Sequence, residues 1–112
     1  MEEITTLEQA KALIDAKEAA IVFKYSPTCG ISQVAQEAWE QFANQANGIH
    51  LAQCDVIQAR PAARGMVDLV KVAHQSPQVL VLKNGVCLAH ASHYSITPAW
   101  LDSAKERLLR ND

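Results

Sequence analysis

Apolar residues recur along the chain with two different spacings, and each spacing predicts one type of element. Apolar side chains three or four residues apart predict helices at residues 7–17, 31–46, 60–73 and 98–108. Short apolar and β-branched runs predict strands at residues 20–25, 50–56, 79–83 and 86–90. The expected order along the chain is therefore α, β, α, β, α, β, β, α.

Local signals fix the ends of several of these elements. Thr5-Thr6-Leu7-Glu8 has the T-x-x-E form of a capping box before the first helix. Asn84-Gly85 suits the two positive-φ positions of a type I′ turn, so residues 79–90 are expected to form a hairpin. Thr97 before Pro98 is typical of an N-cap followed by proline at the first helical position. The inner face of the second helix is expected at Ile31, Val34, Ala38 and Phe42.

A parallel βαβ unit followed by a hairpin and a closing helix is typical of an α/β, thioredoxin-like fold. We expect a central four-stranded mixed sheet flanked by helices, with one helix before the first strand. A chain of 112 residues, 49% of them hydrophobic, suits a single core, so one domain spanning residues 1–112 is expected.

Composition and charge exclude several classes of partner. Ten basic and twelve acidic side chains leave a formal net charge of −2, which favours neither nucleic acid nor a membrane surface. The first residues, MEEITT, lack the basic and apolar regions of a secretory signal, and a cytoplasmic location is expected. An odd set of three cysteines in a reducing compartment argues against structural disulfides.

One cysteine, Cys29, lies at the junction between the first strand and the second helix. Unpaired amides and the positive end of the macrodipole favour a thiolate at a helix N-terminus, which lowers the pKa of such a thiol from ~8.5 to roughly 3.5–7.5. Ser32 stands where a C-x-x-C pair has its second cysteine. Its hydroxyl can donate a hydrogen bond to the thiolate but cannot attack a mixed disulfide, so an outside thiol must resolve it. The alternative is that Cys29 is a small, inert residue at a helix start.

Pro77 directly precedes the predicted hairpin. In a thioredoxin-like layout a cis proline at this point faces the catalytic cysteine, so we predict that the Ser76–Pro77 bond is cis. The Ser76 backbone would then offer hydrogen bonds to a bound substrate strand. In the alternative reading, Pro77 is trans and starts a strand. With Cys29 as the catalytic residue, the expected substrate-binding residues are Thr28, Gly30, Ser32, Ser76 and Pro77.

Other chemically active side chains have simpler expected roles. Cys54 and Cys87 fall in predicted strands, where cysteine usually packs as a small hydrophobe. Lys24 adds a positive charge near the thiolate or is solvated like most lysines. His90 and His93 are separated by an odd number of positions, so on one strand their side chains would point to opposite faces and could not share a metal. No metal site is therefore expected. Trp39 and Trp100 are expected to be packing residues.

Four segments make the chain resemble the monothiol bacilliredoxins of the YtxJ type. They are FKYSPTCGIS at 23–32, QARP at 58–61, HQSPQ at 74–78 and HASHYSI at 90–96. The resemblance implies removal of a low-molecular-weight thiol, bacillithiol, from S-thiolated proteins. Cys29 would take up the bacillithiol and another thiol would free it, with no cofactor beyond this co-substrate. The protein is expected to act as a monomer or weak dimer.

Gly30 departs from that family, which usually has proline after the cysteine. Glycine makes Cys29-Gly30-Ile31-Ser32 similar to the C-G-F-S motif of monothiol glutaredoxins, which use glutathione and carry a [2Fe–2S] cluster between two subunits. Those proteins have a Gly-Gly-Asp segment after the hairpin, whereas His90-Ala91-Ser92-His93 stands there in this chain. A glutaredoxin-like activity and a non-catalytic thioredoxin-fold interaction module are the two alternatives.

Overall fold

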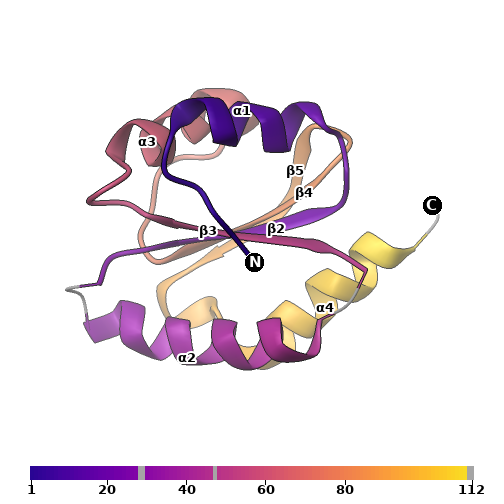
Figure 1. The fold of residues 1–112 in the computed structure, drawn as a ribbon. Helices are drawn as coiled ribbons and strands as arrows, with labels where there is room; N and C mark the ends of the chain where they lie inside the picture. The colour runs from indigo at the N-terminus through magenta and orange to yellow at the C-terminus, as the bar shows by residue number, and fades with distance from the viewer. Residues whose placement is uncertain (28–29, 47, 111–112) are drawn as a thin grey trace.

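The chain forms one mixed β-sheet between two layers of helices, as the computed structural model shows for residues 1–27, 30–46 and 48–110 (Figure 1). The strands are β1 (Glu2–Glu3), β2 (Ala20–Tyr25), β3 (His50–Asp55), β4 (Gln78–Lys83) and β5 (Val86–Ser92). The helices are α1 (Leu7–Asp15), α2 (Gly30–Gln45), α3 (Arg60–Val70) and α4 (Pro98–Leu109), with a short 3₁₀ turn, η1 (His93–Ser95). Helices α1 and α3 cover one face of the sheet, and α2 and α4 cover the other (Figure 1).

The strand order is β1-β3-β2-β4-β5. Strands β1 and β2 run parallel to β3, whereas β4 is antiparallel to both β2 and β5. The expected α/β, thioredoxin-like arrangement is confirmed, but the sheet has five strands rather than four. The additional strand, β1, pairs Glu2 with Ala52 and Glu3 with Gln53. Two acidic residues carry no apolar alternation, so the sequence pattern contains no signal for this edge strand.

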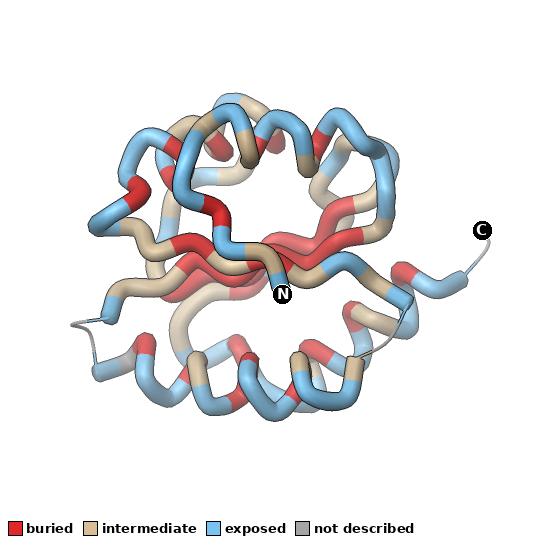
Figure 2. Tube along the Cα trace, in the orientation of Figure 1, coloured by how far each residue is buried: buried red, intermediate tan, exposed pale blue. Residues whose placement is uncertain are grey.

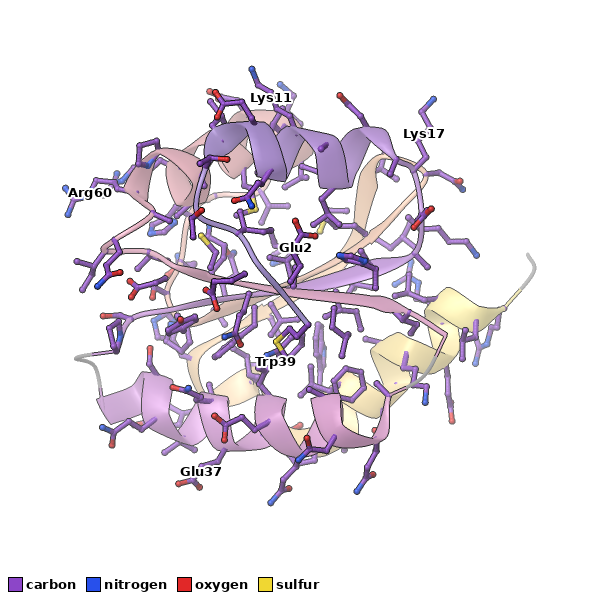
Figure 3. All side chains as sticks on the ribbon, in the orientation of Figure 1. Glu2, Lys11, Lys17, Glu37, Trp39 and Arg60 are labelled. Atoms are coloured by element: carbon purple, nitrogen blue, oxygen red, sulfur yellow. The ribbon has the colours of Figure 1, made fainter. Side chains whose placement is uncertain are left out.

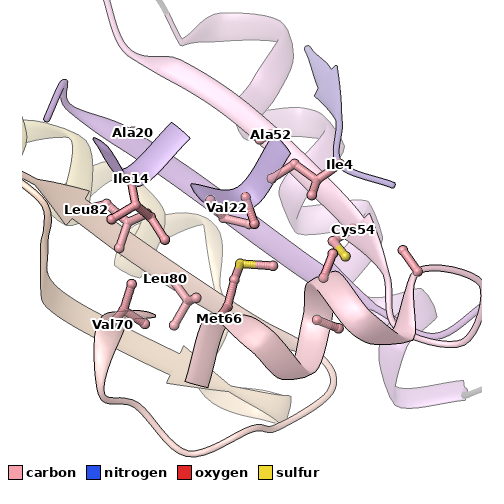
Figure 4. Packing of buried hydrophobic residues seen from close by; sticks show 14 residues of the cluster. Ile4, Ile14, Ala20, Val22, Ala52, Cys54, Met66, Val70, Leu80 and Leu82 are labelled. Atoms are coloured by element: carbon pink, nitrogen blue, oxygen red, sulfur yellow. The ribbon is translucent and has the colours of Figure 1, made fainter. Parts of the chain in front are cut away.

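Buried residues lie on the central strands and at positions of the helices on both faces of the sheet (Figure 2). Successive residues of a strand point to opposite faces, so β2 contributes to two separate hydrophobic clusters. The cluster under α1 and α3, seen in Figure 4, includes Ile4, Ile14, Val22, Cys54, Met66 and Leu80. The cluster under α2 and α4 includes Ile21, Phe23, Trp39, Phe42, Val81 and Leu101.

The first helix begins at Leu7 as predicted, but its capping box lies one residue later than predicted. Thr6, not Thr5, is the N-cap, and its Oγ1 accepts a hydrogen bond from the amide of Gln9 at 3.2 Å. Oε1 of Gln9 in turn accepts a hydrogen bond from the Thr6 amide at 3.0 Å, which completes a capping box with Gln9 in the place predicted for Glu8. Two threonines in a row offer two registers, and Thr6 with Gln9 is the register that forms.

The buried face of α2 also differs from the prediction. Val34 is 56% exposed, while Ala35 and Trp39 are buried; Ala38 and Phe42 are buried as expected, and the side chain of Ile31 lies outside the described part. The Trp39 ring points from α2 toward the sheet and stacks on Phe23 with centroids 5.4 Å apart (Figure 3). Burying this large ring rotates the helix away from the predicted stripe.

The hairpin is confirmed. Asn84 and Gly85 have φ of 57° and 81°, the left-handed values that a type I′ turn requires. Strand β5 extends to Ser92, two residues beyond the prediction, and a register shift beside Val81 interrupts its pairing. The longer strand brings the segment after it, η1, back to the start of β4.

Candidate functional site

The predicted thiol lies outside the described residues, as does Thr28, but both of its flanks are described. Strand β2 ends at Tyr25, and α2 begins at Gly30. The expected strand-to-helix junction is therefore present on either side of residues 28–29. The roles assigned to Cys29 and Thr28 stay predictions.

Ser32 is buried in the first turn of α2, with 1% of its surface exposed. Its Oγ accepts a hydrogen bond from the backbone amide of Ser26 at 3.3 Å. This bond ties the exit of β2 to the start of α2. A hydroxyl that accepts one bond still has its hydrogen to donate, and the donation to Cys29 predicted from the sequence stays a prediction.

Gly30 has open space around it. Apart from its chain neighbours and the backbone of its own helix, no heavy atom lies within 4 Å of a Cβ added at this position. The φ angle of Gly30 is outside the left-handed range. Neither packing nor backbone conformation therefore requires glycine here. The Cβ of the proline that the resembling family usually has at this position would have room.

The Ser76–Pro77 peptide bond is cis, as predicted. Pro77 is buried, and its carbonyl accepts a hydrogen bond from the backbone amide of His93 at 3.1 Å. This bond joins η1 to the proline segment. His93 adopts a φ of 53°, a left-handed conformation that lets the chain turn there. The proposed bonding of a substrate to the Ser76 backbone stays a prediction.

A buried lysine lies directly behind the proline segment. Lys24 is 1% exposed, and its Nζ donates to Oε1 of Gln78 at 3.2 Å. The same Oε1 accepts from the amide of Gln75 at 3.3 Å, and Nε2 of Gln78 donates to the carbonyl of Ala73 at 3.0 Å. The Gln78 side chain thus connects the lysine to the segment 73–77. Sequence reasoning placed Lys24 near the thiolate but favoured a solvated side chain.

Burial and two neighbouring groups change the pKa of Lys24. Its pKa is lowered from 10.5 to about 8, mainly because burial desolvates the ammonium; the Cys54 thiol partly opposes the change and the charge of Arg64 adds to it. Cys54 is its neighbour in register on β3 and is fully buried, so desolvation raises the pKa of that thiol to about 11. Burial also raises the pKa of Cys87, which is half-buried on β5. Both thiols pack as the sequence predicted.

A small cleft lies at the end of β2 on the side of β1 and β3, whereas Gln78 lies on the side of β4. It has a volume of about 220 Å³ and is lined by Glu3, Ile4, Thr5, Tyr25, Asp55, Gln58 and Ala59. The Tyr25 hydroxyl donates to Oε2 of Glu3 at 3.4 Å, and burial together with the Glu3 charge raises the Tyr25 pKa to about 12. The cleft is acidic and was not predicted, because β1 was not.

The described residues contain no group of three His, Cys, Asp or Glu side chains that could hold a metal ion. Within the same residues, no helix has both the length and the apolar character needed to cross a membrane.

The sequence model of the family described as "Monothiol bacilliredoxin BrxC" matches residues 2–101. A solved structure described as having a thioredoxin fold is similar with a TM-score of 0.84 and 24% identity, over 93% of this chain and 92% of that one. Thioredoxin from Fasciola hepatica is similar with a TM-score of 0.76 and 19% identity, over 96% of this chain and 98% of that one. Mitochondrial thioredoxin 3 from Saccharomyces cerevisiae is similar with a TM-score of 0.74 and 16% identity, over 96% of this chain and 94% of that one. These likenesses show the thioredoxin fold.

Proposed function

We propose, because this chain belongs to the monothiol bacilliredoxin family, that Cys29 removes bacillithiol from S-thiolated protein cysteines. Family membership itself supports a thiol–disulfide redox function. The family match over residues 2–101 is the observation that carries the finer proposal. Ser32 in place of a second cysteine supports a single-thiol mechanism.

The reaction is two successive thiol–disulfide exchanges. The Cys29 thiolate attacks the bacillithiol sulfur of the mixed disulfide, and the protein cysteine leaves as a thiolate that takes up a proton. Cys29 is now disulfide-bonded to bacillithiol. A second low-molecular-weight thiol, as thiolate, attacks the bacillithiol sulfur and releases the Cys29 thiolate, and the two small thiols leave as a disulfide. The disulfide bond is therefore passed from the protein to the two small thiols: the protein sulfur is reduced, and the sulfur of the second small thiol is oxidised in its place.

The flanking residues have proposed roles in the first step. The first amides of α2 stabilise the thiolate, and the Ser32 hydroxyl donates to it. The backbone of Ser76, held by cis Pro77, binds the substrate strand. Thr28 and Gly30, the sequence neighbours of Cys29, are the remaining proposed substrate-binding residues. Cys54 is fully buried and therefore poorly placed to resolve the mixed disulfide.

Transfer of the small thiol onto the protein tests the proposal. The reduced chain is incubated with a bacillithiolated model protein, quenched with acid and weighed by mass spectrometry. The mass of one bacillithiol should appear on the wild type and on Cys87→Ser, and should be absent from Cys29→Ser. An adduct that persists in Cys29→Ser, or that is absent from the wild type, contradicts the proposal.

The pH dependence of Cys29 alkylation separates this function from an inert interaction module. A catalytic thiol should react with iodoacetamide with a midpoint well below ~8.5, the ordinary value for cysteine. A midpoint at that ordinary value would favour the non-catalytic module.

The order Cys29-Gly30-Ile31-Ser32 favours a second candidate, a glutaredoxin-like protein that uses glutathione. A [2Fe–2S] cluster would then require Cys29 from two copies and two glutathione thiolates, because Cys54 is buried and burial raises the Cys87 pKa. Anaerobic reconstitution with iron, sulfide and glutathione should give a coloured dimer in that case. A colourless monomer would reject this candidate.

A further inference from the structure

Three basic side chains act on one another electrostatically: Lys24 of β2, exposed Arg64 of α3, and partly buried His74 in the segment before Pro77. We call Lys24, Arg64 and His74 the basic cluster. Burial lowers the pKa of His74, and the charges of Lys24 and Arg64 lower it further. Arg64 acts on Lys24 in the same direction. Like charges shift a pKa in this way when they are neighbours, so the three groups share one electrostatic environment.

No carboxylate neutralises the basic cluster among the described residues. The ion pair found among these residues joins His50 to Glu2 and lies away from the basic cluster, at the β1–β3 edge of the sheet. Asp68, one turn beyond Arg64 on α3, is exposed and makes no ion pair in the described part of the chain. Positive charge next to the proline segment is therefore uncompensated.

The acidic residues on the other side of β2 are already engaged. Glu3 accepts hydrogen bonds from Gln53 at 2.8 Å and from Tyr25 at 3.4 Å. Asp55 accepts from the backbone amides of Ile57 and Gln58 at 2.9 and 3.1 Å. These carboxylates stabilise the β1 and β3 ends and are not placed to pair with the basic cluster.

Two buried polar atoms at the same place have no hydrogen-bond partner in the described structure. They are Nδ1 of His74 and Oγ of Ser76. Buried donors and acceptors are nearly always paired, and leaving one unpaired is costly. Both atoms belong to the segment that the Lys24–Gln78 bond holds against the sheet. An anionic group with several acceptor oxygens would satisfy both atoms and the charge beside them.

We propose that Arg64, His74 and Ser76 form a subsite for the carboxylates of the low-molecular-weight thiol, with Lys24 contributing charge from the core. This inference rests on the proposed function, because bacillithiol carries a malyl group with carboxylates at the end remote from its sulfur. Pro77, next to Ser76, belongs to the segment expected to face the thiol. The subsite would therefore hold the far end of the small thiol while Cys29 attacks its sulfur.

A selectivity experiment tests this subsite. Transfer to Cys29 is followed from mixed disulfides of one peptide with either bacillithiol or cysteinyl-glucosamine, which lacks the malyl group. The wild type should prefer the malyl-bearing substrate in kcat/KM by about tenfold or more, as expected for charge-assisted hydrogen bonds. Arg64→Gln and His74→Gln should each lower this preference about tenfold. Arg107→Gln removes an exposed arginine of α4, on the opposite face, and should keep it.

A titration that needs no reactive thiol keeps the two proposals separable. The ring signals of His74 are followed by NMR against pH in malate and in sodium chloride of equal ionic strength. Malate should raise the His74 pKa saturably, less so in Arg64→Gln, and should leave His50 unaffected. Identical titration in both salts, or an unchanged substrate preference in both variants, overturns the subsite. If neither disulfide reacts with the wild type, the proposed function fails while the malate titration still decides the subsite.

Discussion

Replacing Lys24 by methionine should make the protein more stable at neutral pH. The side chain is 1% exposed, and burial lowers its pKa from 10.5 to about 8. Each pKa unit corresponds to about 1.4 kcal/mol, so keeping this buried amine protonated at pH 7 costs about 3 kcal/mol. Methionine has a similar shape and needs no hydration.

The loss of one hydrogen bond offsets part of that gain. Lys24 donates to Oε1 of Gln78, and a hydrogen bond of this kind contributes about 1 kcal/mol. After the substitution that oxygen still accepts from the amide of Gln75, so it is not left without a partner. The net increase in the free energy of unfolding should be about 2 kcal/mol at pH 7.

The pH dependence of the difference identifies its cause. The folded-state pKa of Lys24 is lowered, so the unfolded chain binds more protons between pH 8 and 10.5 and the wild type gains stability as pH rises through that window. Cys54 and Tyr25, whose pKa values are raised, act oppositely at alkaline pH in both proteins; without Lys24 the pKa of Cys54 rises further, which also reduces the advantage of the variant at high pH. The advantage of Lys24→Met should therefore fall to about zero by pH 10, where the remaining cost of the buried ammonium is about 1 kcal/mol and balances the lost hydrogen bond.

Urea titrations of both proteins at pH 7 and pH 10 measure this difference. Lys24→Gln, which is polar but uncharged, is the matched control and should recover a smaller part of the gain. A variant less stable than the wild type at pH 7, or a difference that is the same at both pH values, would refute the assignment of a desolvated ammonium.

Three further predictions concern the junction between β2 and α2, the N-cap of α4, and the thiols of Cys54 and Cys87. Gly30→Pro should raise the free energy of unfolding by about 0.4–1 kcal/mol, because a Cβ has room and proline suits the first helical turn; a lower melting temperature contradicts this. Thr97→Ala removes the oxygen that accepts from the Trp100 amide at 3.1 Å and should cost about 1 kcal/mol in a urea titration, whereas Thr97→Ser should cost clearly less. In Cys29→Ser, half-buried Cys87 should react with iodoacetamide faster than fully buried Cys54, and equal rates would show that the sheet opens.

Sequence patterns located most of the fold because its elements carry strong local signals. The hairpin follows from Asn84-Gly85, whose positive φ values few other pairs adopt. The start of α4 follows from Thr97, which caps the helix as predicted, with Leu101, Ala104 and Leu108 buried. Periodicity was least reliable on α2, where the volume of Trp39 decides which face is inward.

The surroundings of the site were harder to predict because they depend on partners distant in sequence. Lys24 is held by a side chain 54 residues away, and nothing near it in the sequence distinguishes it from a solvated lysine. Strand β1 is two acidic residues long and exists only through its pairing with β3. The acidic cleft against Tyr25 follows from that strand. The cis bond before Pro77 was predictable only once the order of elements had indicated the fold.

The end of the sheet at which β2 leads toward residues 28–29 is electrically asymmetric. Glu3 and Asp55 act on buried Cys54 from one side and Lys24 acts on it from the other, with opposite effects on its pKa. Lys24 lies five residues before Cys29 on the strand that leads to it. A protonated amine in a medium of low dielectric acts strongly on a nearby anion. We therefore expect that Lys24, which destabilises the fold at pH 7, favours the Cys29 thiolate. The substitution Lys24→Met should then raise the pH midpoint of Cys29 alkylation and, at the same time, stabilise the protein. Stabilisation without any change in that midpoint would separate the two effects and leave Lys24 a purely structural residue.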